Sequence, residues 1–150
     1  MITNSYEETK EFAKEILSKL PVSSKGATVV LLEGDLGVGK TTFVQGLASA
    51  LGVSQPTTSP TFVLEKIYRL PSKSAGGVSG FTEMVHIDAY RLEGEDSREA
   101  LGLDALLMKP HTLVVIEWPE HIIGELPESA VRALFAHQGG DKRSITIAFR

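Results

Sequence analysis

The first third of the chain carries a hydrophobic pattern that predicts a helix, a buried strand and a second helix. Ser5 and Glu8 have the spacing of a capping box that opens a helix. The apolar face of this helix recurs at helical spacing and comprises Phe12, Ile16, Leu17 and Leu20. The apolar run 27–32 is rich in β-branched residues and predicts a buried strand. A second helix, ending at Gly52, is predicted from the spacing of Phe43, Leu47, Ala48 and Leu51.

The remainder of the chain predicts further strands and one more helix. Strands are expected over 62–70, 84–88 and 112–117, and a helix over 97–108 that ends before Pro110. The last segments, 131–137 and 143–149, predict a hairpin around the polar turn 138–141. Residues 71–80 are rich in glycine and serine, and they fit either a long hairpin tip or a partner-binding loop. The pattern therefore predicts an α/β protein with a central mixed β-sheet flanked by helices and a C-terminal β-hairpin.

Composition narrows the class of protein. A length of 150 residues suits a single domain spanning 1–150 with a sizeable core. The absence of cysteine excludes disulfides, thiol catalysis and cysteine-ligated metals. No apolar run approaches the length of a membrane span, and the polar, acidic N-terminus does not resemble a signal peptide, so a cytoplasmic protein is expected. A net charge of −4 argues against strong binding to nucleic acid, so any link to RNA is expected to pass through a partner protein.

Between the first strand and the second helix lies a segment that fits the phosphate-binding loop pattern of P-loop NTPases. Its residues are Gly34, Asp35, Leu36, Gly37, Val38, Gly39, Lys40 and Thr41, followed by Thr42. The glycines let backbone N–H groups turn inward around a phosphate, and Lys40 brings a positive charge to the β and γ phosphates. The Thr41 hydroxyl is placed to complete the shell of a Mg²⁺ ion. The order strand, loop, helix aims a positive helix end at an anion, so a single P-loop NTPase-like domain is predicted. The guanine-reading motif Asn-Lys-x-Asp is missing, which favours ATP over GTP.

Hydrolysis of a nucleotide also needs carboxylates, which hold magnesium and orient the attacking water. Two carboxylates in this chain directly follow apolar strands. Glu117 ends the run 113–116, and Asp88 ends the run 85–87. Ligand-binding residues of α/β proteins gather at the carboxyl ends of strands, and a buried carboxylate is costly without a cation. Both acids are therefore predicted to serve a magnesium site and the attacking water. The structural alternative for each is a helix-capping or surface acid.

Several weaker candidates have both a functional and a structural interpretation. The segment Ser59–Thr61 fits a switch over the γ-phosphate or a plain turn. His86 lies on the same strand face as Asp88, and a hydrogen-bonded core histidine is favoured over a metal ligand. Arg91 and Arg98 fit either a charge-stabilising finger or solvated, salt-bridged arginines. Trp118 fits core packing or a contact surface.

Taken in order, these segments resemble the TsaE (YjeE) family, the small ATPases of bacterial tRNA threonylcarbamoyladenosine biosynthesis. The resemblance extends from about Thr9 to the terminal hairpin. The matching segments are 34–42, the Ser-Pro-Thr-Phe of 59–62, the His-Ile-Asp-Ala-Tyr-Arg-Leu of 86–92, 100–103, the Val-Ile-Glu-Trp-Pro-Glu of 115–120, and 126–127. Each segment after the loop is weak alone, whereas the ordered set is specific.

The resemblance implies roles for particular residues. Thr41 and Glu117 would coordinate Mg²⁺, with Asp88 assisting in the metal or water shell. Thr61 would belong to a switch segment, and Trp118, with Tyr90, to the functional surface. The N-terminal helix, with Thr9, would lie near the nucleotide.

The resemblance also implies partners. TsaB and TsaD homologues would form the complex that modifies tRNA, and ATP binding or turnover by this chain would reset or license that complex. This chain would then meet tRNA only indirectly. A small-molecule kinase and a non-hydrolysing ATP sensor remain alternatives, because phosphate loops serve all three activities.

Overall fold

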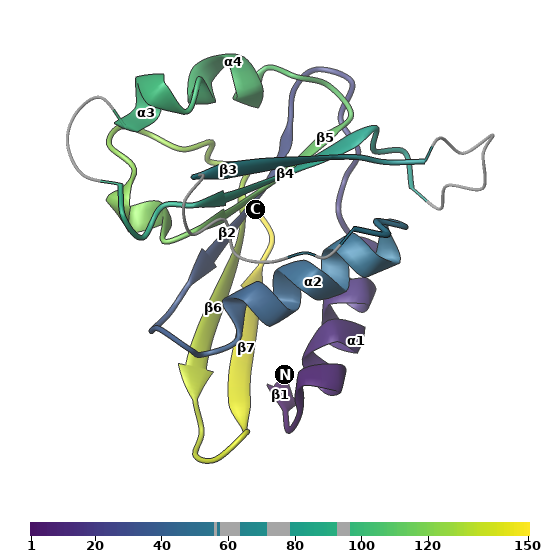
Figure 1. Ribbon diagram of the computed structural model, residues 1–150, viewed down its shortest axis with the longest axis vertical. Helices are drawn as coiled ribbons and strands as arrows, with labels where there is room; N and C mark the ends of the chain where they lie inside the picture. The colour runs from purple at the N-terminus through teal and green to yellow at the C-terminus, as the bar shows by residue number, and fades with distance from the viewer. Residues whose placement is uncertain (56, 58–63, 72–78, 93–96) are drawn as a thin grey trace.

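The computed structural model describes residues 1–55, 57, 64–71, 79–92 and 97–150, and its strands form one seven-stranded sheet in the order β1-β7-β6-β2-β5-β4-β3 (Figure 1). The strands are β1 Ile2–Thr3, β2 Thr28–Glu33, β3 Glu65–Arg69, β4 Glu83–Asp88, β5 Thr112–Glu117, β6 Val131–His137 and β7 Arg143–Ala148. The helices are α1 Tyr6–Leu17, α2 Lys40–Ala50, α3 Ser97–Ala100, α4 Leu103–Leu107 and a short 3₁₀ helix, Pro119–His121. Neighbours among β6, β2, β5 and β4 are parallel, whereas β1, β7 and β3 pair antiparallel, so the predicted mixed sheet is confirmed.

Strand order places the phosphate loop at the centre of the sheet. β2, which precedes the loop, lies between β5 and β6 and runs parallel to both. β5 and β4 are also parallel, so the ends of β2, β5 and β4 lie along one edge. In that register Leu32 pairs with Glu117, and Asp88 pairs with Glu117. The two candidate carboxylates therefore lie beside the loop.

Helices cover both faces of the sheet, and each face has its own apolar core (Figure 1). On one face α1 and α2 pack on Val30, Met84 and Val115. On the other, α4 packs on side chains such as Val114 and Ile116. Alternate residues of a strand point to opposite faces. Glu117 therefore shares the α2 face with Val115, and His86 and Asp88 share it with Met84.

The predicted start of α1 and the C-terminal hairpin are confirmed. Ser5 caps α1, and its hydroxyl accepts a hydrogen bond from the Glu8 amide at 3.2 Å. The Glu8 carboxylate accepts from the amide of Asn4 at 2.7 Å, one residue before the usual capping-box partner. The strands β6 and β7 pair antiparallel with Arg132 opposite Ala148 and His137 opposite Arg143.

One sequence prediction needs correction, and one strand was missed. The helix expected over 97–108 is broken into α3 and α4, because Gly102 adopts a left-handed φ of 57°. The strand β1 was not predicted, because it holds only Ile2 and Thr3 and forms by pairing with β7.

Between β3 and β4 lies the segment 71–80, whose residues 72–78 are outside the described part. β3 and β4 pair antiparallel, so this segment connects the strands of a hairpin. The strand predicted over 62–70 is observed as Glu65–Arg69, and residues 62–63 are not described. Among the described residues, none of the helices has both the length and the hydrophobicity that a membrane span requires.

Gly46 permits the close contact between α1 and α2. A Cβ atom at this position would lie 2.8 Å from the Cβ of Ala13 and from the Cα of Lys10. Gly46→Ala is therefore expected to destabilise the protein by about 1–3 kcal/mol through overpacking. An alanine in an unobstructed helix would instead stabilise it by roughly 0.5–1 kcal/mol. Urea unfolding, with Ser49→Ala on the exposed face of α2 as the control, measures the difference, and a more stable Gly46→Ala protein would contradict the tight contact.

Candidate functional site

Glycine conformations shape the phosphate loop. Gly34 directly follows β2 and has a φ angle of 136°. A Cβ atom at this position would clash with the carbonyl oxygen of Phe135 on β6. Gly39, with φ 105°, is the N-cap residue of α2 and makes no side-chain cap. The first N–H groups of a helix have no partner within the helix, so the N-terminus of α2 is suited to bind an anion.

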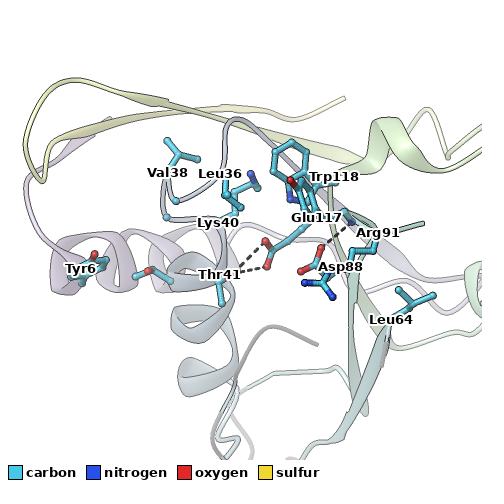
Figure 2. Close-up of a pocket in the computed structure, with 14 residues that line it drawn as sticks. Tyr6, Leu36, Val38, Lys40, Thr41, Leu64, Asp88, Arg91, Glu117 and Trp118 are labelled. Atoms are coloured by element: carbon cyan, nitrogen blue, oxygen red, sulfur yellow. Dashed lines mark hydrogen bonds between the residues drawn. The ribbon is translucent and has the colours of Figure 1, made fainter. Parts of the chain in front are cut away.

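A cleft of about 510 Å³ opens beside this helix end. It is lined by the loop residues Leu36, Gly37, Val38, Gly39, Lys40, Thr41 and Thr42, and by Tyr6, Leu64, Asp88, Tyr90, Arg91, Glu117 and Trp118. Tyr6 and Leu64 lie at opposite ends of the site (Figure 2). The cleft has a volume typical of small-molecule sites. It therefore brings together most of the residues that the sequence predicted for nucleotide and metal binding.

Lys40 is buried at the start of α2. Its ammonium donates to the carbonyl oxygens of Gly34 and Asp35, the latter at 2.9 Å, and lies 3.8 Å from the centre of the Trp118 ring. Burial lowers the pKa of Lys40, and the negative charges of Glu117, Glu120, Asp88 and Asp35 act in the opposite direction. Gly34 and Asp35 thus belong to the site through their carbonyls, although neither lines the cleft.

Thr41 and Glu117 meet across the floor of the cleft. The Thr41 hydroxyl is 3.1 Å from Oε1 and 3.3 Å from Oε2 of Glu117 (Figure 2). Glu117 is only 3% exposed, which excludes the interpretation as a surface acid. Asp88 lies beside it in the register of β4 and β5, and its Oδ1 accepts a hydrogen bond from the Tyr90 amide at 3.0 Å. That bond suits a structural role for Asp88 as well as a place in the site.

His86 is a buried, hydrogen-bonded histidine, as the sequence favoured. Its Nε2 lies 2.8 Å from Oε1 of Glu117, a partner that the sequence did not predict. Within the described residues, no group of three or more His, Cys, Asp and Glu side chains is arranged to hold a metal ion.

An aromatic group borders the cleft on the side of Lys40. The Trp118 ring lies 4.9 Å from that of Tyr90 and 5.7 Å from that of His121. The Nδ1 atom of His121 donates to the carbonyls of Ala89 and Tyr90, both at 3.0 Å, which ties the group to the end of β4. Trp118 has a left-handed φ of 59°, so the chain turns sharply directly after Glu117. This turn directs the indole toward Lys40.

The remaining candidates lie in different places. Thr9 is fully buried and does not line the cleft. Its hydroxyl donates to the carbonyl of Ser5 at 3.0 Å, and the Thr3 hydroxyl lies 2.9 Å from it. Its nucleotide role therefore stays a prediction, and the neighbouring residue that lines the cleft is Tyr6. Arg98 pairs with Asp104 at 2.7 Å, as expected of a salt-bridged arginine, whereas Arg91 lines the cleft. The segment Ser59–Thr61, with the predicted site residue Thr61, lies outside the described residues.

Sequence reasoning missed Arg143, which lies directly behind the loop. Its Nη2 donates to the carbonyl of Asp141 at 2.9 Å, and its guanidinium lies 4.9 Å from the Tyr6 ring. A Cβ atom at Gly39 would be 2.6 Å from Nη1 of Arg143. The positive φ angle of 105° favours glycine at position 39, and a larger residue there would also displace the end of the Arg143 side chain. No local signal identifies this contact, because Arg143 comes from the distant strand β7.

Comparisons with known proteins identify one family. Residues 3–145 match the family model described as "Threonylcarbamoyl adenosine biosynthesis protein TsaE". The tRNA threonylcarbamoyladenosine biosynthesis protein TsaE of Bacillus subtilis is 36% identical over 141 residues, or 94% of this chain and 79% of that protein. The protein of the same name from Rickettsia bellii is 37% identical over 97% of this chain and 92% of its own length. The crystal structure of Bacillus subtilis YdiB superposes with a TM-score of 0.73 and 31% identity, covering 99% of this chain and 83% of that chain.

Proposed function

The chain belongs to the TsaE family of threonylcarbamoyl adenosine biosynthesis proteins, and from this membership we propose that it is a magnesium-dependent ATPase serving tRNA threonylcarbamoyladenosine biosynthesis. The observation that carries the proposal is the contact between Thr41, at the start of α2, and the buried Glu117 carboxylate. That contact joins the phosphate loop to the acid of the neighbouring strand.

ATP is the proposed nucleotide. Its phosphates would lie at the N-terminus of α2, where loop N–H groups and the helix dipole favour negative charge. Lys40 would offset charge on the β and γ phosphates, because its ammonium already lies over the loop and close to the cleft. The lowered pKa of Lys40 reflects burial, and a phosphate partner would favour the charged ammonium again.

The donor set beside the loop suits Mg²⁺. The Thr41 hydroxyl and the Glu117 carboxylate are hard oxygen ligands that already lie within hydrogen-bond distance of each other. Among the described residues, the side-chain hydrogen-bond partners of Glu117 are this hydroxyl and a histidine, and neither is a permanent cation. A bound Mg²⁺ would neutralise part of the phosphate charge. Asp88, next to Glu117 in the sheet, would help to hold water in place.

We propose that turnover of ATP by this chain depends on a partner complex. The relatives carry names in tRNA threonylcarbamoyladenosine biosynthesis, and the family resemblance implies work with TsaB and TsaD homologues. The chain's net charge of −4 suits contact with tRNA through those proteins and not directly. A cytoplasmic location follows from the same role.

Phosphate release from ATP and Mg²⁺ tests this function. We expect slow release by the chain alone, strong stimulation by the TsaB and TsaD homologues of the same organism, and loss of that stimulation in Lys40→Ala. Equal rates with and without those proteins would contradict the partner-dependent role. ADP formed together with a phosphorylated acceptor, and without free phosphate, would instead identify a kinase.

A further inference from the structure

We propose that His86 is a positioning residue that holds the Glu117 carboxylate in the orientation required for Mg²⁺. The inference rests on the proposed function, because it names what orients the acid of the proposed metal site. His86 itself does not line the cleft, so it would act only through Glu117.

The position of His86 in the sheet supports this role. His86 lies on β4 opposite Val115, and Glu117 ends β5 opposite Asp88, so the two side chains share one face of adjacent strands. Nε2 of His86 lies 2.8 Å from Oε1 of Glu117. The exposed fractions are 0% for His86 and 3% for Glu117, so bulk water does not compete for this bond.

The direction of the hydrogen bond follows from the chemistry of the partners. An ionised carboxylate only accepts, so Nε2 must carry the proton and donate it to Oε1. Nδ1 of His86 is buried and has no hydrogen-bond partner among the described residues. The hydrogen bond between the two side chains therefore uses the Nε2–H of His86.

The hydrogen bond from His86 has a consequence for the site. An N–H donor on a rigid ring holds the Glu117 carboxylate in one orientation, and the remaining lone pairs of its oxygens stay available to a cation. Oε1 is held by His86, and both oxygens lie within reach of the Thr41 hydroxyl. His86 and Thr41 therefore fix the plane of the carboxylate. Metal ligands in proteins are commonly oriented by such hydrogen bonds.

Two amide variants separate this role from simple core packing. The side-chain nitrogen of Gln reaches roughly the position of Nε2, and that of Asn only the position of Nδ1. The affinity of the protein for a fluorescent ATP analogue is measured over a range of Mg²⁺ concentrations. The quantity compared is the Mg²⁺ concentration at which half of the gain in affinity is reached. His86→Asn is expected to raise that concentration by about 10-fold or more, and His86→Gln by less than about threefold. Binding of the analogue in EDTA should stay the same in both, because the loop and Lys40 carry it.

Each outcome decides the proposal. Unchanged magnesium dependence in His86→Asn, or equal losses in both variants, would overturn it. A wild-type protein that binds ATP without any effect of Mg²⁺ would instead refute the magnesium site, and a wild-type protein that does not bind ATP would refute the proposed function. If neither variant folds, ¹⁵N NMR of the wild-type histidine rings decides: a proton on Nε2 of His86 is expected, and a proton on Nδ1 alone would overturn the inference.

Discussion

Lys40→Ala is expected to weaken ATP binding by about 30-fold or more, because truncating one member of a buried charge pair costs roughly 2–5 kcal/mol. Lys40 is 4% exposed, and its ammonium lies over the loop that would hold the phosphates. The cation would therefore meet the phosphates in a desolvated site, where Coulomb interactions are stronger than in water. Burial lowers the pKa of Lys40, so the charged ammonium is favoured less in the folded protein than in water, and a phosphate would offset that loss.

Isothermal titration with ATP and Mg²⁺ measures the effect of the Lys40 change. Lys40→Met is the matched variant, because it keeps an apolar stem against Trp118 and loses only the charge. Both variants should lose binding, whereas Lys25→Ala, at an exposed position in the turn before β2, should bind ATP like the wild type. Unchanged ATP affinity in the Lys40 variants would refute the phosphate-loop assignment.

Glu117→Gln is expected to reduce partner-stimulated phosphate release by about 10²–10³-fold, the range seen when one electrostatic group of a catalytic site is removed. Glutamine retains an oxygen that can accept from Nε2 of His86, so the buried histidine keeps its partner. What the variant lacks is the negative charge beside Thr41. ATP affinity in EDTA should change by less than about threefold, since Lys40 and the loop N–H groups are intact.

Glu120→Gln provides the control for charge. Glu120 lies on the same turn, is exposed, and contributes to the electrostatic environment of Lys40 as Glu117 does. The same chemical change at position 120 should alter phosphate release by no more than about threefold, since exposed charges are screened by solvent. Equal losses at both positions would indicate a general effect of negative charge and would remove Glu117 from the metal site. Full turnover in Glu117→Gln would remove it from the mechanism.

Much of the fold was predictable because its signals are local. The apolar run before the loop, the Ser5 cap and the C-terminal hairpin depend on residues close together in the chain, and the structure confirms all three. The break at Gly102 was missed because the apolar spacing continues across it, while the backbone adopts a left-handed φ of 57°. β1 was missed because a two-residue strand has no periodicity, and only its pairing with β7 creates it.

The sequence by itself predicted the glycine-rich loop 34–41, the strand that leads into it and the acids at two strand ends, since each depends on spacing along the chain. Tertiary structure alone decided which groups those residues meet. His86 contacts Glu117 because β4 lies beside β5, and Arg143 lies against Gly39 because β7 begins opposite the end of β6, which runs parallel to β2. The turn at Trp118 brings its indole over Lys40. Strand order and register are set by the packing of the whole core, and no local stretch of sequence encodes them.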